Sequence, residues 1–584
     1  MTRPRTANRV PWWRHRDSGQ VGLFIVAVLG MFLVGFVGFG VDMTNLWFHR
    51  QAAQGAADAA CIAGAMDMLV QAGGSASGGF GPGSPIPVRT AFDCATTATA
   101  TTPCQYAALN GYSSPGLTAG GASNDVSVSF PTSVAGYTAP DAAYGVPTAF
   151  MRVDVADQVP VYFSALISAR TTRVVRATAK CGLLTAAAPV PIVVLNPTCT
   201  HAFEDSGSGT VAIIGGPPRG VMVNSGNSTC AAATQSGGCT SNTTIDLSKG
   251  GPMYTGSDFG VFGTPTTAPP GFNGGTTGNW LSPATPVPDP FRTMAPPSTA
   301  GLAVDPAPTT VSYGTDGCPD QTSGCVEYSP GLYNSGISVK NQVAIFKPGV
   351  YYIKGTTKGN CGSPGTGCVA KPTGQCNYGL AIGPNGVVRP STAAGDGSGG
   401  TMFYLSGAGT SNKPYGSALF DANAGKSPGS DVVDDFNSSS VFCSGGGPDP
   451  AAPPLPATLA GNILLAPCTG TYGANPYRGM LMYQDRANGD PNGQPSMQGG
   501  GGLLLGGNLY FHNCPENDAL ITGACAAPPT DYNAFLNLQG NSGSSTYIYG
   551  DIITDQLSLG GGGTIDMQLN PYASRNVLKV ALLQ

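Results

Sequence analysis

Carboxylates are the first residues to weigh for chemistry, because glycoside hydrolysis uses a pair of them. Acidic residues gather in two stretches of the C-terminal half: Asp431, Asp434 and Asp435 in SDVVDDFNSSS, then Asp485 and Asp490. Both stretches are rich in Ser, Gly and Asn, so polar turns exposed to solvent explain them without catalysis. We therefore expect no catalytic residue among them.

Patterns for metals, nucleophiles and phosphates are equally sparse. Oxygen ligands for calcium could come from one short segment: Asp485, Asn488, Asp490 and Asn492. No Glu follows at the EF-hand spacing, no Cys-x-x-Cys occurs, and the four histidines are scattered. His512 lies two residues before Cys514, which we interpret as a surface histidine beside a disulfide. The glycine runs 500–502 and 560–563 lack the Lys-Ser/Thr of a phosphate loop. We expect no metal, no cofactor and no enzyme.

Composition favours an exported β protein. The 584 residues include 86 Gly and 50 Pro, yet 41% are hydrophobic and only 10% are charged. Disorder would require few apolar residues and high net charge, whereas many turns between short strands fit these numbers. The net charge of −5 argues against nucleic-acid binding, which needs basic patches.

One stretch, Val21 to Val41, is apolar and uncharged over its whole length. Its length matches the ~20 residues that a helix needs to cross a bilayer. Five arginines precede it: Arg3, Arg5, Arg9, Arg14 and Arg16. Basic flanks stay in the cytoplasm, so we expect a single-pass protein of the inner membrane with a cytoplasmic tail (1–20), a transmembrane helix (21–41) and an exported remainder. The alternative, a signal peptide, is disfavoured because the run is long and no small-x-small cleavage site follows.

Sixteen cysteines on an exported chain indicate disulfides. We predict local pairs where two cysteines lie close in sequence: Cys94/Cys104, Cys230/Cys239, Cys318/Cys325, Cys361/Cys368 and Cys514/Cys525. Six cysteines stay unassigned: Cys61, Cys181, Cys199, Cys376, Cys443 and Cys468.

Residues 42–70 predict an Ala-rich helix that leaves the membrane, since Ala is the best helix former and no Pro interrupts the run. Small residues on the span and on this helix would let another helix approach closely: Gly30, Gly35, Ala56, Ala57, Ala60, Ala63 and Gly64. The alternative is a helix that has no partner.

The same region resembles a known family. Gly19-Gln20, Val41-Asp42 and Gln54 followed by Ala56-Ala57-Asp58-Ala59-Ala60 are similar to the N-terminal region of TadE/TadG-like proteins of Tad (Flp) pilus assembly, over residues 18–66. Pilin-like relatives carry a Glu five residues after a Gly cleavage point, and Phe24 stands there in this chain. The resemblance therefore implies an uncleaved anchor. The Asp-x-Ser-x-Ser metal motif of some TadG proteins is absent from the sequence.

The remaining chain divides by pattern. Residues 71–123 and 183–191 read as linkers, and 124–182 as a small strand–helix–strand unit similar to the one that follows the anchor in TadG-like proteins. From 192 to 584, apolar alternations of four to six residues recur between Gly, Asn and Ser turns. They predict a mainly β fold whose exported part is a long, right-handed parallel β-helix or solenoid. The segments 329–333, 348–353 and 483–486 resemble segments of the β-helix-like regions of some TadG-like proteins.

These patterns together predict a non-enzymatic, membrane-anchored component of Tad-type pilus assembly or surface display. Its expected partners are the lipid bilayer and other pilus-assembly or envelope proteins, with a surface glycan, host or substratum as a further contact and no nucleic acid. Two alternatives stay open. One is a membrane-tethered β-helix that binds or cleaves carbohydrate, and the other is a surface-layer or adhesion protein unrelated to pili.

Overall fold

The structure is a computed structural model of the whole chain. It describes the following residues: 17–72, 84, 86–87, 90–95, 101–118, 122–140, 146, 148–187, 190–207, 210–233, 239, 244–292, 294–361, 374–383, 385–393, 400–406, 417–422, 463–465, 477, 479–486, 494–499, 502–514, 532–540, 545–562, 564–569 and 576–583. The basic tail, Cys368, Cys443, Cys468, Cys525 and the carboxylates Asp431, Asp434, Asp435 and Asp490 lie outside them.

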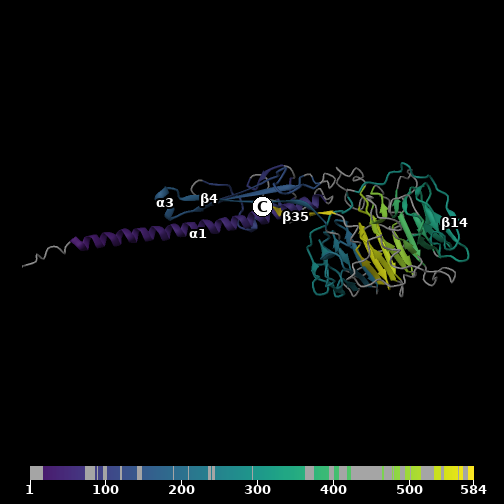
Figure 1. Cartoon of the computed structure of the whole chain (residues 1–584). Helices are drawn as coiled ribbons and strands as arrows, with labels where there is room; N and C mark the ends of the chain where they lie inside the picture. The colour runs from purple at the N-terminus through teal and green to yellow at the C-terminus, as the bar shows by residue number, and fades with distance from the viewer. Residues whose placement is uncertain are drawn as a thin grey trace, which may run out of the picture.

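A single helix, α1 (Asp17–Ala72), forms the stem of the molecule. Its 56 residues join the predicted span and the predicted Ala-rich helix without a break. In Figure 1 its N-terminal half projects alone, while its C-terminal half lies along a small sheet. The change follows the sequence, because large apolar side chains fill the first half and Ala dominates the second.

The small sheet is antiparallel and has the strand order β1-β2-β3-β4-β35. Its strands are β1 (Phe92–Asp93), β2 (Ser123–Ser129), β3 (Phe150–Pro160), β4 (Thr172–Ala187) and β35 (Asn576–Leu583). Two short helices accompany it, α2 (Thr102–Leu109) and α3 (Phe163–Ser168). The two long strands β3 and β4 follow the alternating pattern of the sequence, which places Val153 and Val155 in a core shared with α1.

Beyond the small sheet, three sheets form what we call the parallel stack, residues 192–568. The eleven-strand sheet contains, in spatial order, β12 (Phe272–Asn273), β10 (Thr244–Asp246), β7 (Thr210–Ile214), β34 (Thr564–Gln568), β31 (Ser545–Tyr549), β28 (Leu503–Gly506), β25 (Ile463–Leu465), β22 (Val387–Pro390), β18 (Val343–Phe346), β15 (Cys325–Tyr328) and β14 (Thr309–Val311).

The ten-strand sheet contains β13 (Trp280–Leu281), β11 (Asp258–Val261), β8 (Arg219–Val223), β5 (Ile192–Val194), β32 (Ile552–Thr554), β29 (Asn508–Phe511), β26 (Met480–Gln484), β23 (Thr401–Leu405), β19 (Gly349–Ile353) and β16 (Gly331–Tyr333). The nine-strand sheet contains β17 (Ile337–Val339), β21 (Gln375–Ile382), β24 (Ser417–Ala422), β27 (Ser496–Gly499), β30 (Phe535–Gly540), β33 (Gln556–Gly561), β6 (Phe203–Gly207) and β9 (Ala232–Ala233), with β20 (Thr357–Asn360) beside β21. A short 3-10 helix covers Thr315–Gly317.

The chain enters the stack in its middle. It runs through β5, β6 and β7 and then builds outward toward β13. It restarts at the opposite end with β14 and works back, so that its last strands pair in parallel with its first: β32 with β5, β33 with β6 and β34 with β7. We call this junction the seam. A continuous apolar core passes through it, including Phe203, Leu557 and Ile192.

The structure confirms a mainly β protein with a long apolar N-terminal helix and few other helices, and its parallel sheets fit a β-helix-like arrangement. Both expected linkers contain regular structure. Residues 71–123 include α2, which packs in the core beneath α1, and β4 extends to Ala187 within 183–191. β35 leaves the expected β-helix region and returns to the small sheet, where it pairs with β4 along its whole length and buries Leu578 and Leu583.

Five disulfides are placed among the described residues. Three join pairs that are close in sequence, as the spacing predicts: Cys94–Cys104, Cys230–Cys239 and Cys318–Cys325. The expected Cys361–Cys368 pair is a correction, because Cys361 bonds Cys376 across the antiparallel pair β20–β21, where Gly359 faces Cys376. Cys61 on α1 bonds Cys181 on β4. Cys199 and Cys514 are also disulfide-bonded.

Candidate functional site: the apolar helix and its junction with the small sheet

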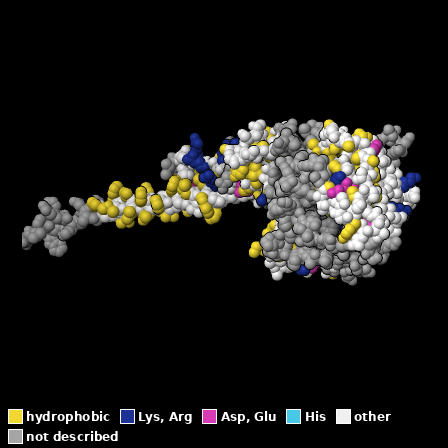
Figure 2. All heavy atoms as spheres, turned by 45° about the vertical axis from the view of Figure 1, so that its right-hand side comes forward, with side chains coloured by type: hydrophobic (Ala, Val, Ile, Leu, Met, Phe, Trp, Pro, Cys, Tyr) yellow, Lys and Arg dark blue, Asp and Glu magenta, His cyan; other side chains and the backbone are white. Residues whose placement is uncertain are grey.

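The first half of α1 exposes large apolar side chains along its length. Phe24 is 70% exposed and Met31 78% exposed, and the mean hydropathy of the most apolar stretch is 2.6. Figure 2 shows these side chains covering the projecting part of the stem. In water such a surface would be unfavourable, so this half fits a membrane-spanning or signal segment. Gly30 and Gly35 lie here, and no described residue outside the helix backbone comes within 4 Å of where a Cβ atom on either glycine would stand.

The second half of α1 presents its small residues to the chain's own sheet. Ala56, Ala57 and Ala60 are completely buried in a core with β3 and β4, and Ala63 is nearly so. A Cβ atom added to Gly64 would meet the side chains of Met151 and Pro103. The face of small residues, which we expected to receive another helix, is therefore covered by the chain's own small sheet. The sequence showed that something would pack closely there, but an Ala-rich face does not specify which partner does so.

At the junction, Asp42 joins α1 to α3. Its carboxylate accepts hydrogen bonds from the backbone N–H groups of Tyr162 (3.0 Å) and Ser164 (2.6 Å). Burial would raise the pKa of Asp42, but the hydrogen bonds from Ser164 and Tyr162 outweigh it and lower the pKa. The ring of Phe163 occupies the space beside Gly38 in which a Cβ atom would stand. Asp42, the first residue past the apolar stretch, thus holds α3 against α1.

Polar contacts continue up the helix from this point. Asn45 Nδ2 donates to the Pro160 carbonyl at 3.3 Å, and Gln54 Nε2 donates to the Thr178 carbonyl at 3.2 Å. His49 Nδ1 lies 2.8 Å from Asp157 Oδ2, which also accepts a hydrogen bond from the Tyr112 hydroxyl at 3.2 Å. Burial and the Asp157 carboxylate raise the pKa of Tyr112. Together these contacts and the Cys61–Cys181 disulfide hold α1 against the sheet over its whole second half.

The C-terminal end of α1 contacts the parallel stack. Arg292 donates a hydrogen bond to the Ala72 carbonyl, and Thr285 lies 3.6 Å from the Met66 sulfur. Both stack residues belong to the segment 282–295, which we call the strap. The helix therefore touches the small sheet and the strap, and it connects the apolar stretch to both.

Residues 19–67 match the family model "Putative Flp pilus-assembly TadE/G-like". This TadE/G-like segment lies wholly within α1, which extends two residues before the segment and five residues after it. It holds the apolar stretch, Asp42 and the buried alanines, so the family match and the described junction are the same part of the molecule. No curated protein and no solved structure matches the chain.

The TadE/G-like segment contains a junction residue whose contacts sequence reasoning missed. Asp42 entered the analysis only as part of the Val-Asp step of the resemblance. An acidic residue directly after an apolar span was the available signal, but its partners lie 120 residues away and no local pattern could identify them.

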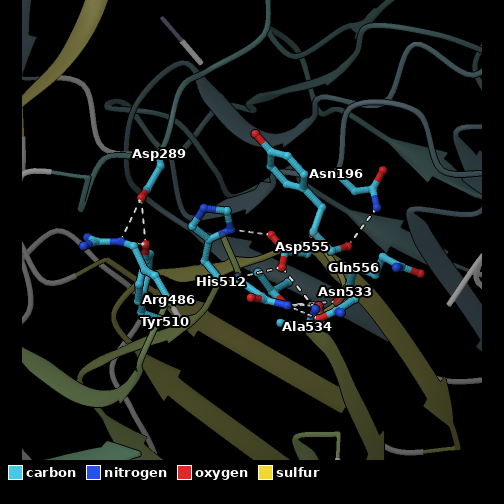
Figure 3. A network of polar contacts seen from close by, with 12 residues as sticks. Asn196, Asp289, Arg486, Tyr510, His512, Asn533, Ala534, Asp555 and Gln556 are labelled. Carbon is cyan, nitrogen blue, oxygen red and sulfur yellow. Dashed lines mark hydrogen bonds and ion pairs between the residues drawn. The ribbon is translucent and has the colours of Figure 1, made fainter. Parts of the chain in front are cut away.

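A second candidate site is a buried polar network in the stack (Figure 3). Asp555 accepts hydrogen bonds from the backbone N–H groups of Asn513 (2.9 Å) and Ala534 (3.1 Å), and its Oδ1 lies 2.5 Å from His512 Nδ1. Burial raises the pKa of Asp555, and the nearby His512 opposes that rise. Asn196, after β5, donates to the Tyr532 carbonyl at 2.9 Å. The network thus joins the first and last strands at the seam.

The same figure shows how the strap is held. Arg486 donates to the Tyr510 hydroxyl (2.7 Å) and to the Met294 carbonyl (3.0 Å), and Tyr510 donates to Asp289 at 2.7 Å. Phe291 and Met294 pack with Tyr483 and Tyr510 over the outer face of the ten-strand sheet. His512, expected at the surface, is 3% exposed, because Tyr532 and Tyr510 pack against its ring.

This second site has the character of a structural staple. Tyr483, Tyr510 and Asp555 are completely buried, so no substrate reaches them in this conformation. Among the residues that the structure describes, no cluster of three or more His, Cys, Asp or Glu side chains could hold a metal ion. The junction on α1 is therefore the better candidate for the functional surface.

Proposed function

We propose that the chain is a single-pass, non-enzymatic component of Tad/Flp-type pilus assembly or surface display. The observation that carries the proposal is the TadE/G-like match at 19–67, which falls on a helix that is exposed and apolar in one half and built into its own fold in the other. In this proposal α1 crosses the inner membrane with the N-terminus in the cytoplasm. Asp42, just past Val41, marks the point where the chain leaves the hydrocarbon.

The parallel stack is then a stiff, disulfide-stapled solenoid held outside the cytosol as a spacer or contact surface. Three features support stiffness: the three sheets share one apolar core, the seam joins strands from both ends of the region, and β35 returns to the small sheet. Partners in the pilus or envelope would meet either the stack or the bare half of α1, where Gly30 and Gly35 leave room for a helix.

A carbohydrate-active role receives less support. A sugar-binding face would require accessible aromatic side chains with carboxylates beside them. The stacked tyrosines Tyr404, Tyr483 and Tyr510 lie near a carboxylate, Asp289, but the strap covers these tyrosines.

Deleting the gene in a strain that makes Tad pili tests the proposal. We expect fewer surface pili or weaker surface attachment, restored by the full chain but not by a chain that lacks residues 21–41. Normal piliation and attachment in the deletion strain would refute the proposal.

A further inference from the structure

The tip of the small sheet carries an apolar and basic surface that the described residues leave uncovered. We define the tip as residues 162–176, which comprise α3 and the start of β4. Leu166 is 84% exposed and Tyr162 66% exposed. Arg170 is exposed and Arg173 is half-buried. Figure 2 shows basic side chains gathered on the small unit just above the apolar stem. Within the described part of the chain, neither arginine forms an ion pair.

The height of the tip along α1 follows from its contacts. Phe163 lies on Gly38, and Asp42 binds the N–H groups of Tyr162 and Ser164, so α3 is level with the end of the apolar stretch. Asn45 binds Pro160, which pairs with Thr172, the residue before Arg173. A helix rises 1.5 Å per residue, so Thr172 lies about 6 Å beyond Val41. Arg173 is one strand residue farther from the span and lies about 9 Å beyond Val41.

These heights match the layers of a bilayer. The interfacial region is roughly 5–7 Å thick on each side of the hydrocarbon. Leu166, Phe163 and Tyr162 therefore stand at the edge of the hydrocarbon. The backbone of Arg173 lies just past the headgroup layer, and the long side chains of Arg170 and Arg173 can place their guanidinium groups within it. Amphipathic surfaces with this order of apolar and basic residues bind anionic membranes.

We propose that the tip is a second membrane contact, which rests on the surface of the bilayer that α1 crosses and binds anionic lipid headgroups through Arg170 and Arg173. The inference rests on the proposed membrane span. Its consequence is orientation: a lone helix can tilt and rotate, whereas a helix with a lipid-bound tip beside it holds the small sheet and the stack at a fixed angle to the membrane.

The charges around the tip favour anionic lipid headgroups as its partner over an acidic or basic protein surface. Arg176, farther from the membrane, has the carboxylate of Asp125 near it, and Arg152 pairs with Asp154 at 2.7 Å. Arg170 and Arg173 have no ion-pair partner among the described residues, and they lie nearer the apolar stretch than Arg50 on α1. The Asp42 carboxylate at the same level is already held by the N–H groups of Tyr162 and Ser164, which leaves the two arginines to face the bilayer surface.

The test uses the full chain in vesicles of phosphatidylcholine, with and without phosphatidylglycerol. An environment-sensitive fluorophore is attached at Leu166→Cys, with Leu109→Cys as the matched control, an equally exposed leucine on α2, and Phe32→Cys as the marker of the span. We expect quenching by brominated lipid and a blue-shifted emission at 166 and 32, and a water-like signal at 109. The shift at 166 should be larger with phosphatidylglycerol.

The arginines are tested in the labelled background with Arg170→Gln and Arg173→Gln together. We expect the effect of phosphatidylglycerol at 166 to disappear while the signal at 32 stays unchanged. A water-like signal at 166 with a quenched probe at 32 would overturn the tip contact and leave the anchor intact. A water-like signal at 32 would instead refute the span itself. A shift at 166 that persists without the arginines refutes their role, and a shift found only in native membranes assigns the tip to a protein partner and overturns the lipid contact.

Discussion

At the scale of single residues, the junction depends on the absence of a side chain at Gly38. The Phe163 ring fills that space, and a methyl group there would force the ring and α3 away from α1. We predict that Gly38→Ala loosens the contact by about 1–3 kcal/mol, so that amide exchange in 162–168 becomes roughly five times faster or more.

Gly35→Ala is the matched control for this prediction, since it lies one turn earlier on the same helix with nothing near it. It should leave exchange in α3 unchanged. Equal exchange in the two variants would show that Phe163 does not pack on Gly38.

Asp205 gives a pH-dependent prediction at the seam. It lies on β6 beside Leu559 of β33, and burial together with the neighbouring Glu204 raises its pKa to about 7. The folded state therefore holds a proton that the unfolded state has lost, and stability falls as the pH rises from about 4 to about 7. We predict that Asp205→Asn raises the free energy of unfolding at pH 8 by about 2–4 kcal/mol and changes it little at pH 4.

Denaturant titrations of both proteins at the two pH values measure this difference. A gain of equal size at pH 4 and pH 8 would contradict the assignment of the proton to Asp205.

At the scale of elements, the Cys61–Cys181 disulfide closes the longest loop among the placed disulfides, with a sequence separation of 120. The loss of loop entropy in the unfolded chain grows with loop length, so this bond should stabilise most. We predict that Cys61→Ser with Cys181→Ser costs about 3–5 kcal/mol, and that Cys94→Ser with Cys104→Ser, which opens a loop of separation 10, costs less. Unfolding monitored in nanodiscs compares the two, and the reverse order would contradict the prediction.

The elements also show what the sequence could and could not predict. Local signals identified α1, β3, β4 and the short strands, because periodicity and length are properties of the segment itself. The pairing of Cys61 with Cys181 and the position of β35 depend on contacts between distant parts of the chain. Tertiary packing also overrode the local composition of residues 101–118, where Cys104 and Ala107 lie in the core although the stretch reads as a linker.

At the scale of the whole molecule, the chain closes on itself. The strand β35 returns past the stack to pair with β4, so these residues stabilise the unit beside the apolar half of α1. Two neighbouring leucines on β35 test this: Leu583 is 1% exposed and Leu582 is 44% exposed. We predict that Leu583→Ala costs about 2–5 kcal/mol and Leu582→Ala much less.

Limited proteolysis reports on this difference, since a weakened β35 should open cleavage in β4 and the second half of α1 before the stack. Identical cleavage of the two variants would show that β35 does not support the small sheet. The sequence could not predict this closure, because the short apolar run NVLKVALL resembles one more strand of the stack until its partner is known.

We propose that α1 holds the small sheet and the stack on the outer side of the cytoplasmic membrane. Fusing alkaline phosphatase, and separately green fluorescent protein, after Gln584 of the full chain measures this placement. We expect active phosphatase, a dark fluorescent fusion, and a protein that stays in the membrane fraction after alkaline carbonate extraction. A fluorescent fusion with inactive phosphatase, or a protein released by carbonate, would contradict it.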